Sequence, residues 1–177
     1  MKKICVLALL LMGMALMTGC TLSKDFIVTL EKEYTVNYNG TSYSKAELIN
    51  ATSFSDDLDK FEDDLKSVNV TKVTYIVTYF NGPASQQINS ALLSVAPADG
   101  SSFTTLTSFA NVNLASVAAK EQEVEVDEAG EEVVEDELLG ADHSLQMKFA
   151  GTANQAPLNF KIKFKVTCKV KYEKKLI

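Results

Sequence analysis

Few side chains in this sequence are suited to catalysis at neutral pH. His143 is the only imidazole, and the three thiols are Cys5, Cys20 and Cys168. A catalytic triad needs a histidine that a carboxylate orients beside a nucleophile, and no G-x-S-x-G elbow or HExxH motif places such a group. Cys168 lies on the apolar side of an alternating segment, where a thiol is inert. We therefore predict no catalytic site, no metal centre and no cofactor, so that the protein is not an enzyme.

Acidic residues concentrate between residues 121 and 137, which contain ten Asp or Glu and no Lys. Carboxylate oxygens are the ligands that Ca²⁺ prefers, but the spacing is not that of an EF-hand. We interpret this stretch as a solvated charged surface. The five aspartates within residues 56–64 are interpreted in the same way, because acids near the start of a helix interact favourably with its dipole.

Lysines recur at odd positions from 161 to 171, opposite an unbroken apolar series at even positions. This row could contact anionic headgroups or an acidic partner. It could equally be the wet side of a strand, where charge discourages edge-to-edge aggregation. A third interpretation follows from the matching two-residue spacing of Glu121, Glu123 and Glu125. If those strands are neighbours, opposite charges face each other across them.

The overall composition excludes some function classes. All 17 basic residues are Lys, against 23 acids, which gives a net charge of −6. Arg is the usual residue for bidentate recognition of phosphate and of guanine, so a nucleic-acid partner is not expected. The 46% hydrophobic and 23% charged content is typical of a globular domain.

The first twenty residues have the pattern of an export signal. Lys2 and Lys3 precede an apolar run of 14 residues from Ile4 to Met17. The run is too short to span a bilayer, which takes about 20 residues. Its dimensions are those of a secretory signal peptide.

The end of that run resembles the lipobox of bacterial lipoproteins, which is an apolar residue, a small residue, Gly or Ala, and then Cys. The corresponding residues are Met17, Thr18, Gly19 and Cys20. The resemblance implies cleavage between Gly19 and Cys20, a diacylglyceryl thioether on Cys20 and an acyl chain such as palmitate on the new amine. Two or more chains give stable membrane anchoring. Thr21, which is not the Asp that retains such proteins in the inner membrane, implies the outer membrane where the cell has two.

These features predict three segments: a signal peptide at residues 1–19, a lipidated tether at 20–25, and a single β-rich domain at 26–177. The exported chain would have 158 residues and a net charge of −8. Cys168 would then be its only free thiol, so that no disulfide or CxxC zinc site can form.

Within the domain, alternating apolar residues predict strands at 26–36, 68–80, 88–96 and 158–172. The last would be roughly 50 Å long, a length at which strands usually bend or change partner. A phase slip predicts a bulge near Thr71. Residues 101–119 are ambiguous, and 131–139 could be a short acidic helix or an excursion outside the core.

Three local signals add turns and helices. Asn39-Gly40 predicts a type I′ hairpin turn. Ser44 and Glu47 have the spacing of a capping box, which predicts a helix at 45–51. Leu58, Phe61 and Leu65 recur at helical spacing and predict a helix at 56–66.

Many strands with few short helices predict a mainly β fold, an antiparallel β-sandwich with two or three short helices. The alternative is a small antiparallel β-barrel. The predicted function is that of a lipid-anchored cell-envelope protein, a non-catalytic binding or structural module with an envelope protein partner. The alternatives are an envelope carrier or sensor of a small apolar or sugar ligand and, last, an envelope hydrolase that uses His143.

Overall fold

A computed structural model describes residues 21–175 of the chain. Its elements follow in chain order: β1 (Thr21–Tyr38), β2 (Ser42–Asn50), the 3₁₀ turn η2 (Ala51–Ser53), α2 (Asp57–Lys60), the 3₁₀ turn η3 (Glu62–Asp64), β3 (Leu65–Phe80), β4 (Gln87–Pro97), β5 (Thr104–Asn113), α3 (Leu114–Val117), β6 (Glu121–Val124), α4 (Glu128–Leu139), β7 (Ser144–Ala153) and β8 (Leu158–Lys175).

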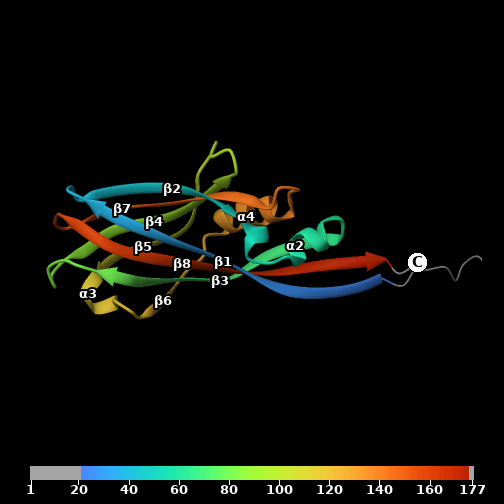
Figure 1. Cartoon of the computed structure of the whole chain (residues 1–177), viewed down its shortest axis with the longest axis horizontal. Helices are drawn as coiled ribbons and strands as arrows, with labels where there is room; N and C mark the ends of the chain where they lie inside the picture. The colour runs from blue at the N-terminus through green and yellow to red at the C-terminus, as the bar shows by residue number, and fades with distance from the viewer. Residues whose placement is uncertain (1–20, 176–177) are drawn as a thin grey trace, which may run out of the picture.

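The strands form two four-stranded sheets that pack face to face (Figure 1). One sheet has the order β1-β8-β3-β6 and the other β2-β7-β4-β5. Every pairing is antiparallel, and β1 pairs with β8, β2 with β7, β3 with β6 and β4 with β5. This nested pairing is the strand order of a jelly roll, a two-sheet sandwich. The predicted antiparallel β-sandwich is therefore confirmed.

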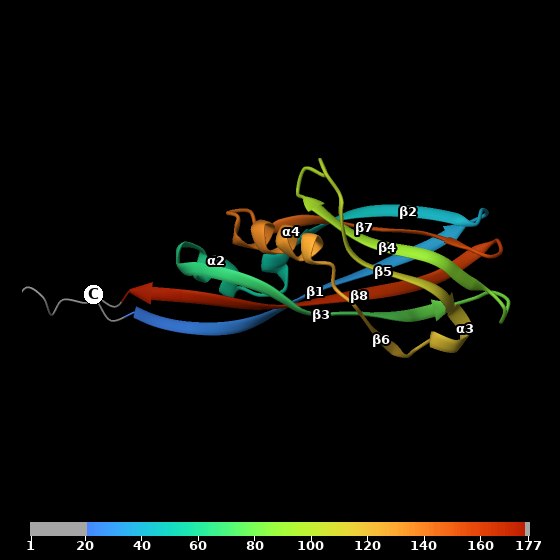
Figure 2. The same cartoon turned by 180° about the vertical axis from the view of Figure 1, so that it is seen from behind.

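β1 and β8 extend beyond the rest of the sandwich as a ribbon (Figures 1 and 2). They pair over 18 residues, from Thr21 opposite Lys175 to Tyr38 opposite Leu158. β3 joins β8 only up to Tyr172, so the tip of the ribbon is two-stranded. Residues 21–25, expected to be a tether, are instead the start of β1. β8 keeps β1 as a neighbour along its whole length rather than changing partner.

Side chains from the inner faces of both sheets fill the core. Tyr34, Phe149 and Phe164 are fully buried and lie with ring centroids 5.0–6.1 Å apart. The Tyr34 hydroxyl donates a hydrogen bond to the Met147 carbonyl of the facing sheet at 2.7 Å. Aromatic pairs at such spacings stabilise a core beyond their area burial, and the hydrogen bond satisfies a polar group that the core would otherwise leave unpaired.

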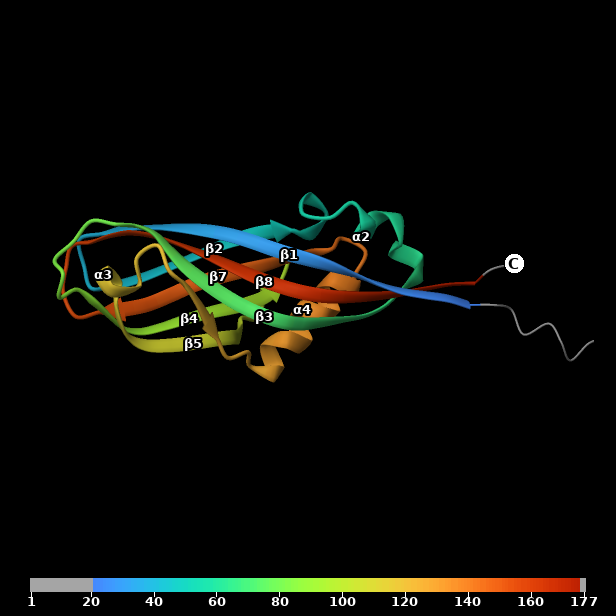
Figure 3. The same cartoon turned by 90° about the horizontal axis from the view of Figure 1, so that it is seen from below.

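α4 closes one side of the sandwich, where it lies between β3 and β5 (Figure 3). Val134 and Leu138 on its inner side are fully buried. The Glu131 carboxylate of α4 accepts a hydrogen bond from the Val70 N–H at 3.0 Å. Val70 belongs to a part of β3 that does not pair with the short β6 strand. The stretch 131–139 is thus a helix that takes part in the core.

An ion triad lies on the opposite side, where β1 and β2 are the edge strands of their sheets. Lys32 and Lys45 contact the Glu47 carboxylate at 2.5 and 2.7 Å. These lysines hold the pKa of Glu47 below its ordinary value through hydrogen bonds and charge. Charged side chains on edge strands discourage pairing with another chain.

Two of the local predictions are wrong for the same reason. The Asn39-Gly40 turn does not form a hairpin, since β1 and β2 lie in different sheets. Residues 45–51 are not a helix, since β2 covers 42–50 and pairs with β7. Glu47, expected in a capping box, binds lysines instead. In both places pairing with a strand distant in sequence decides the structure, and at 45–51 it overrode a helix propensity worth less than about 1 kcal/mol per residue.

The helix predicted at 56–66 is broken. α2 ends at Lys60, a 3₁₀ turn follows, and β3 begins at Leu65. Phe61 stacks on Tyr172 of the ribbon with centroids 4.0 Å apart. Elsewhere the predicted strands are confirmed, and the predicted bulge is present between Val70 and Lys72.

Candidate functional site on the charged sheet

The outer side of the β1-β8-β3-β6 sheet concentrates the charged groups of the strands. Successive residues of a strand point to opposite sides, so β8 sends its apolar residues inward and its lysines outward. Acids of β1 and β6 and one lysine of β3 join this row. We call the set the charged face: Asp25, Glu31, Glu33, Lys72, Glu121, Glu123, Lys161, Lys163, Lys165, Lys169 and Lys171.

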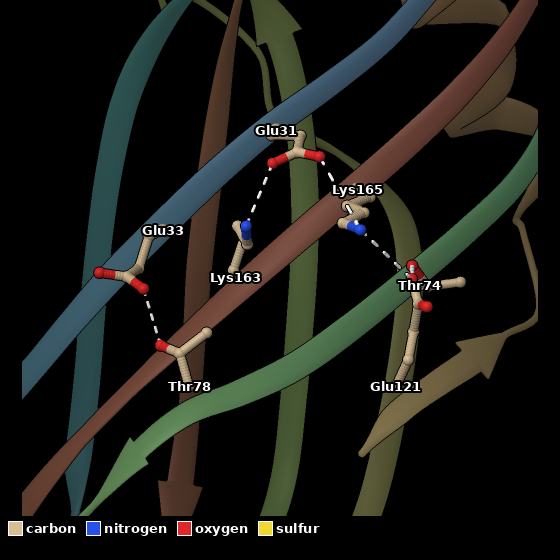
Figure 4. Close-up of polar contacts among 7 residues, drawn as sticks. All are labelled: Glu31, Glu33, Thr74, Thr78, Glu121, Lys163 and Lys165. Atoms are coloured by element: carbon tan, nitrogen blue, oxygen red, sulfur yellow. Dashed lines mark hydrogen bonds and ion pairs between the residues drawn. The ribbon is translucent and has the colours of Figure 1, made fainter. Parts of the chain in front are cut away.

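Glu31 of β1 is the centre of the charged face (Figure 4). One of its carboxylate oxygens lies 3.2 Å from Lys163 Nζ and the other 3.9 Å from Lys165 Nζ. β1 and β8 are neighbours with Glu31 directly opposite Lys165. The lysine row therefore finds its first partner on β1.

Glu121 of β6 reaches the same lysine row from the far side of β3 (Figure 4). Its Oε1 accepts a hydrogen bond from the Thr74 hydroxyl at 2.7 Å and lies 3.8 Å from Lys165 Nζ. The Thr74 hydrogen bond, and then the Lys165 charge, lower the pKa of Glu121. The predicted neighbour relation of the two strands is wrong, because β3 lies between β6 and β8. The second acid, Glu123, binds Lys72 instead at 3.0 Å.

Acids of β1 also meet lysines at both ends of the row. Glu33 lies 3.7 Å from Lys161 and accepts a hydrogen bond from the Thr78 hydroxyl at 2.7 Å. Asp25 binds Lys169 at 2.7 Å. Glu31 and Glu33 were missed as partners, although they share the two-residue spacing of the lysines. We call these ion pairs between β8 lysines and acids of neighbouring strands the ladder. Exposed ion pairs contribute about 0–1 kcal/mol each, so the ladder specifies which strands meet more than it stabilises the sheet.

A polar hollow of about 340 Å³ opens on the charged face beside the ribbon. Three strands line it with hydroxyl, amide, ammonium and carboxylate groups: Ser23, Lys24, Asp25, Ser67, Asn69, Lys169 and Lys171. A second hollow, of about 160 Å³, lies between β5 and residues 125–127 and is also polar. Neither is the concave apolar pocket that a carrier of an apolar ligand would use.

The outer side of the β2-β7-β4-β5 sheet is nearly uncharged. Its outward residues are small or neutral apart from one lysine: Ser42, Ser44, Ala46, Leu48, Ser90, Leu92, Ser108, Ala110, Gln146, Lys148, Ala150 and Thr152. The Lys148 ammonium lies 3.9 Å from the centre of the Phe103 ring. A cation over an aromatic face is attracted to it.

His143 and Cys168 lie inside the fold. His143 is buried with a left-handed backbone (φ 43°), and its Nδ1 lies 2.7 Å from the Leu138 carbonyl oxygen. Among residues 21–175 no acid or hydroxyl hydrogen-bonds to its ring. Burial, with the nearby Glu131 charge, raises the pKa of the Cys168 thiol to about 12. A thiol with such a pKa is a poor nucleophile at neutral pH.

The acidic stretch 121–137 serves the fold at several positions. Asp127 caps α4 by accepting a hydrogen bond from the Ala129 N–H at 3.1 Å. Glu131 accepts from β3, and Glu121 belongs to the charged face. Within the part of the chain that the structure describes, no three acidic, histidine or cysteine side chains converge on a metal position.

The predicted lipidation residue Cys20 and the cleavage position at Gly19 lie outside the described residues. Thr21, the next residue, opens β1 at the tip of the ribbon. Between residues 21 and 175, no helix is long and apolar enough to cross a membrane.

The sandwich belongs to a class of folds that many unrelated proteins share, and comparison with known proteins gives this chain no family. No family model matches it, and no curated protein does. Solved structures with weak likeness include Desmodium yellow mottle tymovirus (14% identity, 87% of this chain and 90% of that one, TM-score 0.37). Others are the decameric BFDV capsid protein (11%, 85% and 99%, 0.38) and the acidic stable capsid of Helicobacter pylori bacteriophage KHP30 (15%, 89% and 100%, 0.37). Likeness at this level carries no argument about function.

Proposed function

We propose that the protein is a lipid-anchored component of the bacterial cell envelope, a non-catalytic binding or structural module held by acyl chains on Cys20. The observation that carries the proposal is that a lipobox-like motif directly precedes the first strand of the ribbon. The lipobox-like Met17-Thr18-Gly19-Cys20 ends one residue before Thr21, and Thr21 opens the ribbon at the end of the sandwich (Figure 1).

The ribbon suits an anchored domain. Pairing with β8 begins at Thr21, so little slack separates Cys20 from folded structure. The two-stranded tip would lie at the bilayer, and the broad part of the sandwich would stand away from it. An outer-membrane position in a two-membrane cell belongs to the same proposal and rests on Thr21.

The non-catalytic part of the proposal rests on how the fold uses its reactive groups. Cys168 is buried with a high pKa, and His143 Nδ1 contacts a backbone carbonyl. The space between the sheets is filled by apolar and aromatic side chains. These observations favour a module that acts through its surface over a carrier that encloses a ligand.

Membrane fractionation of a Cys20→Ser variant tests the anchor. We expect the wild-type chain to sediment with membranes and to be released by detergent. The Cys20→Ser variant should remain unprocessed or leave the membrane fraction. Cys168→Ala is the matched control, because it also removes a thiol and should fractionate as wild type. Equal fractionation of wild type and Cys20→Ser as processed proteins would contradict the proposal.

The binding role has its own test. Intact lipoprotein is cross-linked in cells, purified from membranes in detergent, and compared with a sample in which Glu31, Lys163 and Lys165 are replaced by Gln. A partner recovered with the first sample at stoichiometric yield supports a surface-acting module. Recovery of the chain alone, with cross-linking efficient for a known complex in the same cells, would leave only a structural role.

A further inference from the structure

We propose that β1 pairs edge to edge with β1 of a second copy of this chain, so that the two copies share one continuous eight-stranded sheet. β1 is the outermost strand of its sheet (Figure 4). The pairing surface is its free side between Asp25 and Glu31, which we call the open edge. Pairing there would not depend on the lipid anchor of the proposed function.

The other three edges of the two sheets carry features that block the addition of a strand. β6 is only four residues long, and the ion triad around Glu47 protects β2. On the outer side of β5, the Leu106 carbonyl accepts a hydrogen bond from the Asp127 N–H at 2.8 Å. Further along β5, Asn111 has a left-handed backbone (φ 57°), which interrupts the regular extended chain. Short edge strands, charges and covering segments are the means by which proteins prevent edge-to-edge pairing.

The open edge is regular and unpaired in the described part of the chain. β1 runs along β8 for 18 residues without a register shift, whereas β3 makes three such shifts on the other side of β8. The five residues from Phe26 to Leu30 include no charge, glycine or proline. Within residues 21–175, the backbone of residues 21–31 hydrogen-bonds to no element other than β8. The open edge therefore presents a row of free N–H and C=O groups, which is a template for another strand.

Ile27 lies at the middle of the open edge. Its side chain is on the outer side of the sheet, opposite Lys169, while Phe26 and Val28 on either side pack into the core. Ile27 is 58% exposed, more than any other large hydrophobic residue of the described chain. A strand placed beside β1 would cover this side chain together with the free backbone groups.

The charges of β1 fit a second copy in one antiparallel register. When Ile27 lies opposite Ile27 of the other copy, Asp25 lies opposite Thr29. In the same register Glu31 lies opposite Ser23. No two charged residues of the open edge then face each other, and the two isoleucines cover one another. A self-complementary contact about a two-fold axis is the usual geometry of a homodimer.

The neighbouring registers are less favourable. A pairing centred on Val28 places Asp25 opposite Glu31 twice, and like charges directly opposite are destabilising. A pairing centred on Phe26 places Ile27 opposite the Asp25 carboxylate. The charge pattern therefore selects the register centred on Ile27.

Thiol cross-linking of the full chain, purified in detergent, tests the pairing. Ile27→Cys and Thr35→Cys are matched variants in a Cys168→Ala background, since both residues are exposed on the outer side of β1. In the proposed dimer the two residues 27 have Cα atoms about 5 Å apart, whereas the two residues 35 are roughly 50 Å apart. With a short thiol–thiol cross-linker, we expect the dimer of the Ile27→Cys variant to form at least about tenfold faster. The Cys168→Ala parent is the blank for the other thiols of the chain.

A charge at the centre of the open edge gives a second test. Ile27→Lys places two ammonium groups opposite each other and should convert the dimer to a monomer in native mass spectrometry. Thr35→Lys is the matched control and should leave the dimer intact. Circular dichroism confirms that each variant is folded, which is expected because both side chains are exposed.

Each contrary outcome removes the inference. Equal cross-linking at positions 27 and 35, or a wild-type chain that is monomeric, overturns the pairing. A dimer that persists in the Ile27→Lys variant places the contact elsewhere and overturns it as well. A different protein that co-purifies with the wild-type chain, but not with Ile27→Lys, assigns the open edge to that protein and overturns the second copy. The anchor is tested separately, by fractionation of Cys20→Ser.

Discussion

The two sides of β8 differ in what they contribute. Its inward residues, from Leu158 to Val170, are all 0–1% exposed. Its outward lysines have side chains 33–51% exposed. Four of them meet acids from neighbouring strands, and Lys171 pairs with Glu173 of β8 itself. One strand thus carries the core on one side and the charged face on the other.

Stability and pairing specificity come from different sides of β8. Burying a large apolar side chain contributes about 1.5–3 kcal/mol, whereas an exposed ion pair contributes about 0–1 kcal/mol. A shift of register by one residue would turn every β8 lysine into the core. The apolar side therefore holds the sandwich together, and the ladder of pairs from Asp25 to Glu33 favours the observed partners of β8.

Truncation of a core aromatic should show the largest effect. Phe164→Ala should lower the free energy of unfolding by about 3–5 kcal/mol, because Phe164 is fully buried against Tyr34 and Phe149. Urea denaturation measures the change. Lys165→Ala is the control on the next residue and should stay within about 1 kcal/mol. Similar losses for both variants would contradict the contrast between the two sides of β8.

Alkaline pH should weaken the inner side selectively. The Cys168 thiol has a folded pKa of about 12, while an unfolded thiol has a pKa near 8.5. The folded state keeps the proton, so its stability is full below about pH 8.5 and falls as pH rises toward 12, by roughly 2 kcal/mol at pH 10. Burial also raises the pKa of Tyr34 and Tyr43, which adds to the loss. Denaturation at pH 7 to 10 should show a shallower decline for Cys168→Ala. Parallel declines would refute this role of the thiol.

The hydrogen bond from the Tyr34 hydroxyl to the facing sheet should contribute less to the free energy of unfolding than a buried aromatic ring does. Tyr34→Phe keeps the ring and removes the donor to the Met147 carbonyl. A loss of about 1 kcal/mol is expected, since a buried acceptor is left unpaired. Tyr79, which is 46% exposed, provides the matched Tyr→Phe control and should change stability by less than about 0.5 kcal/mol. Equal free energies of unfolding for Tyr34→Phe and Tyr79→Phe in urea would show that the Tyr34 hydroxyl does not stabilise the fold.

Charge reversal on the ladder should have the smallest effect and should be repairable. Glu31→Lys places a third ammonium beside Lys163 and Lys165 and should cost up to about 1 kcal/mol. A double variant, Glu31→Lys with Lys163→Glu, should recover part of the loss at low salt. High salt should erase the difference, because exposed charges are screened. A double-mutant cycle with no coupling energy between Glu31 and Lys163 would show that these charges do not contribute to strand pairing.

Period-two spacing explains how much of the fold was predictable. The apolar series in 158–172 predicted the buried side of β8, and the phase slip near Thr71 predicted a bulge, because both are local consequences of the pleat. The hairpin at Asn39-Gly40 and the helix at 45–51 failed because partners distant in sequence decide them. Strand order is non-local, so the spacing of Glu121 and Glu123 could not reveal that β3 intervenes. The same two-residue spacing on β1 could have identified Glu31 as a partner of the β8 lysines.

Mass spectrometry of the N-terminal peptide of the protein purified from membranes tests the lipid anchor. We expect a peptide that begins at Cys20 and carries a diacylglyceryl thioether, with or without an acyl chain on its amine. The peptide that contains Cys168 is the internal control and should carry an unmodified thiol. An N-terminus at another residue, or a Cys20 without lipid in the membrane-purified protein, would show that the chain is not anchored through Cys20.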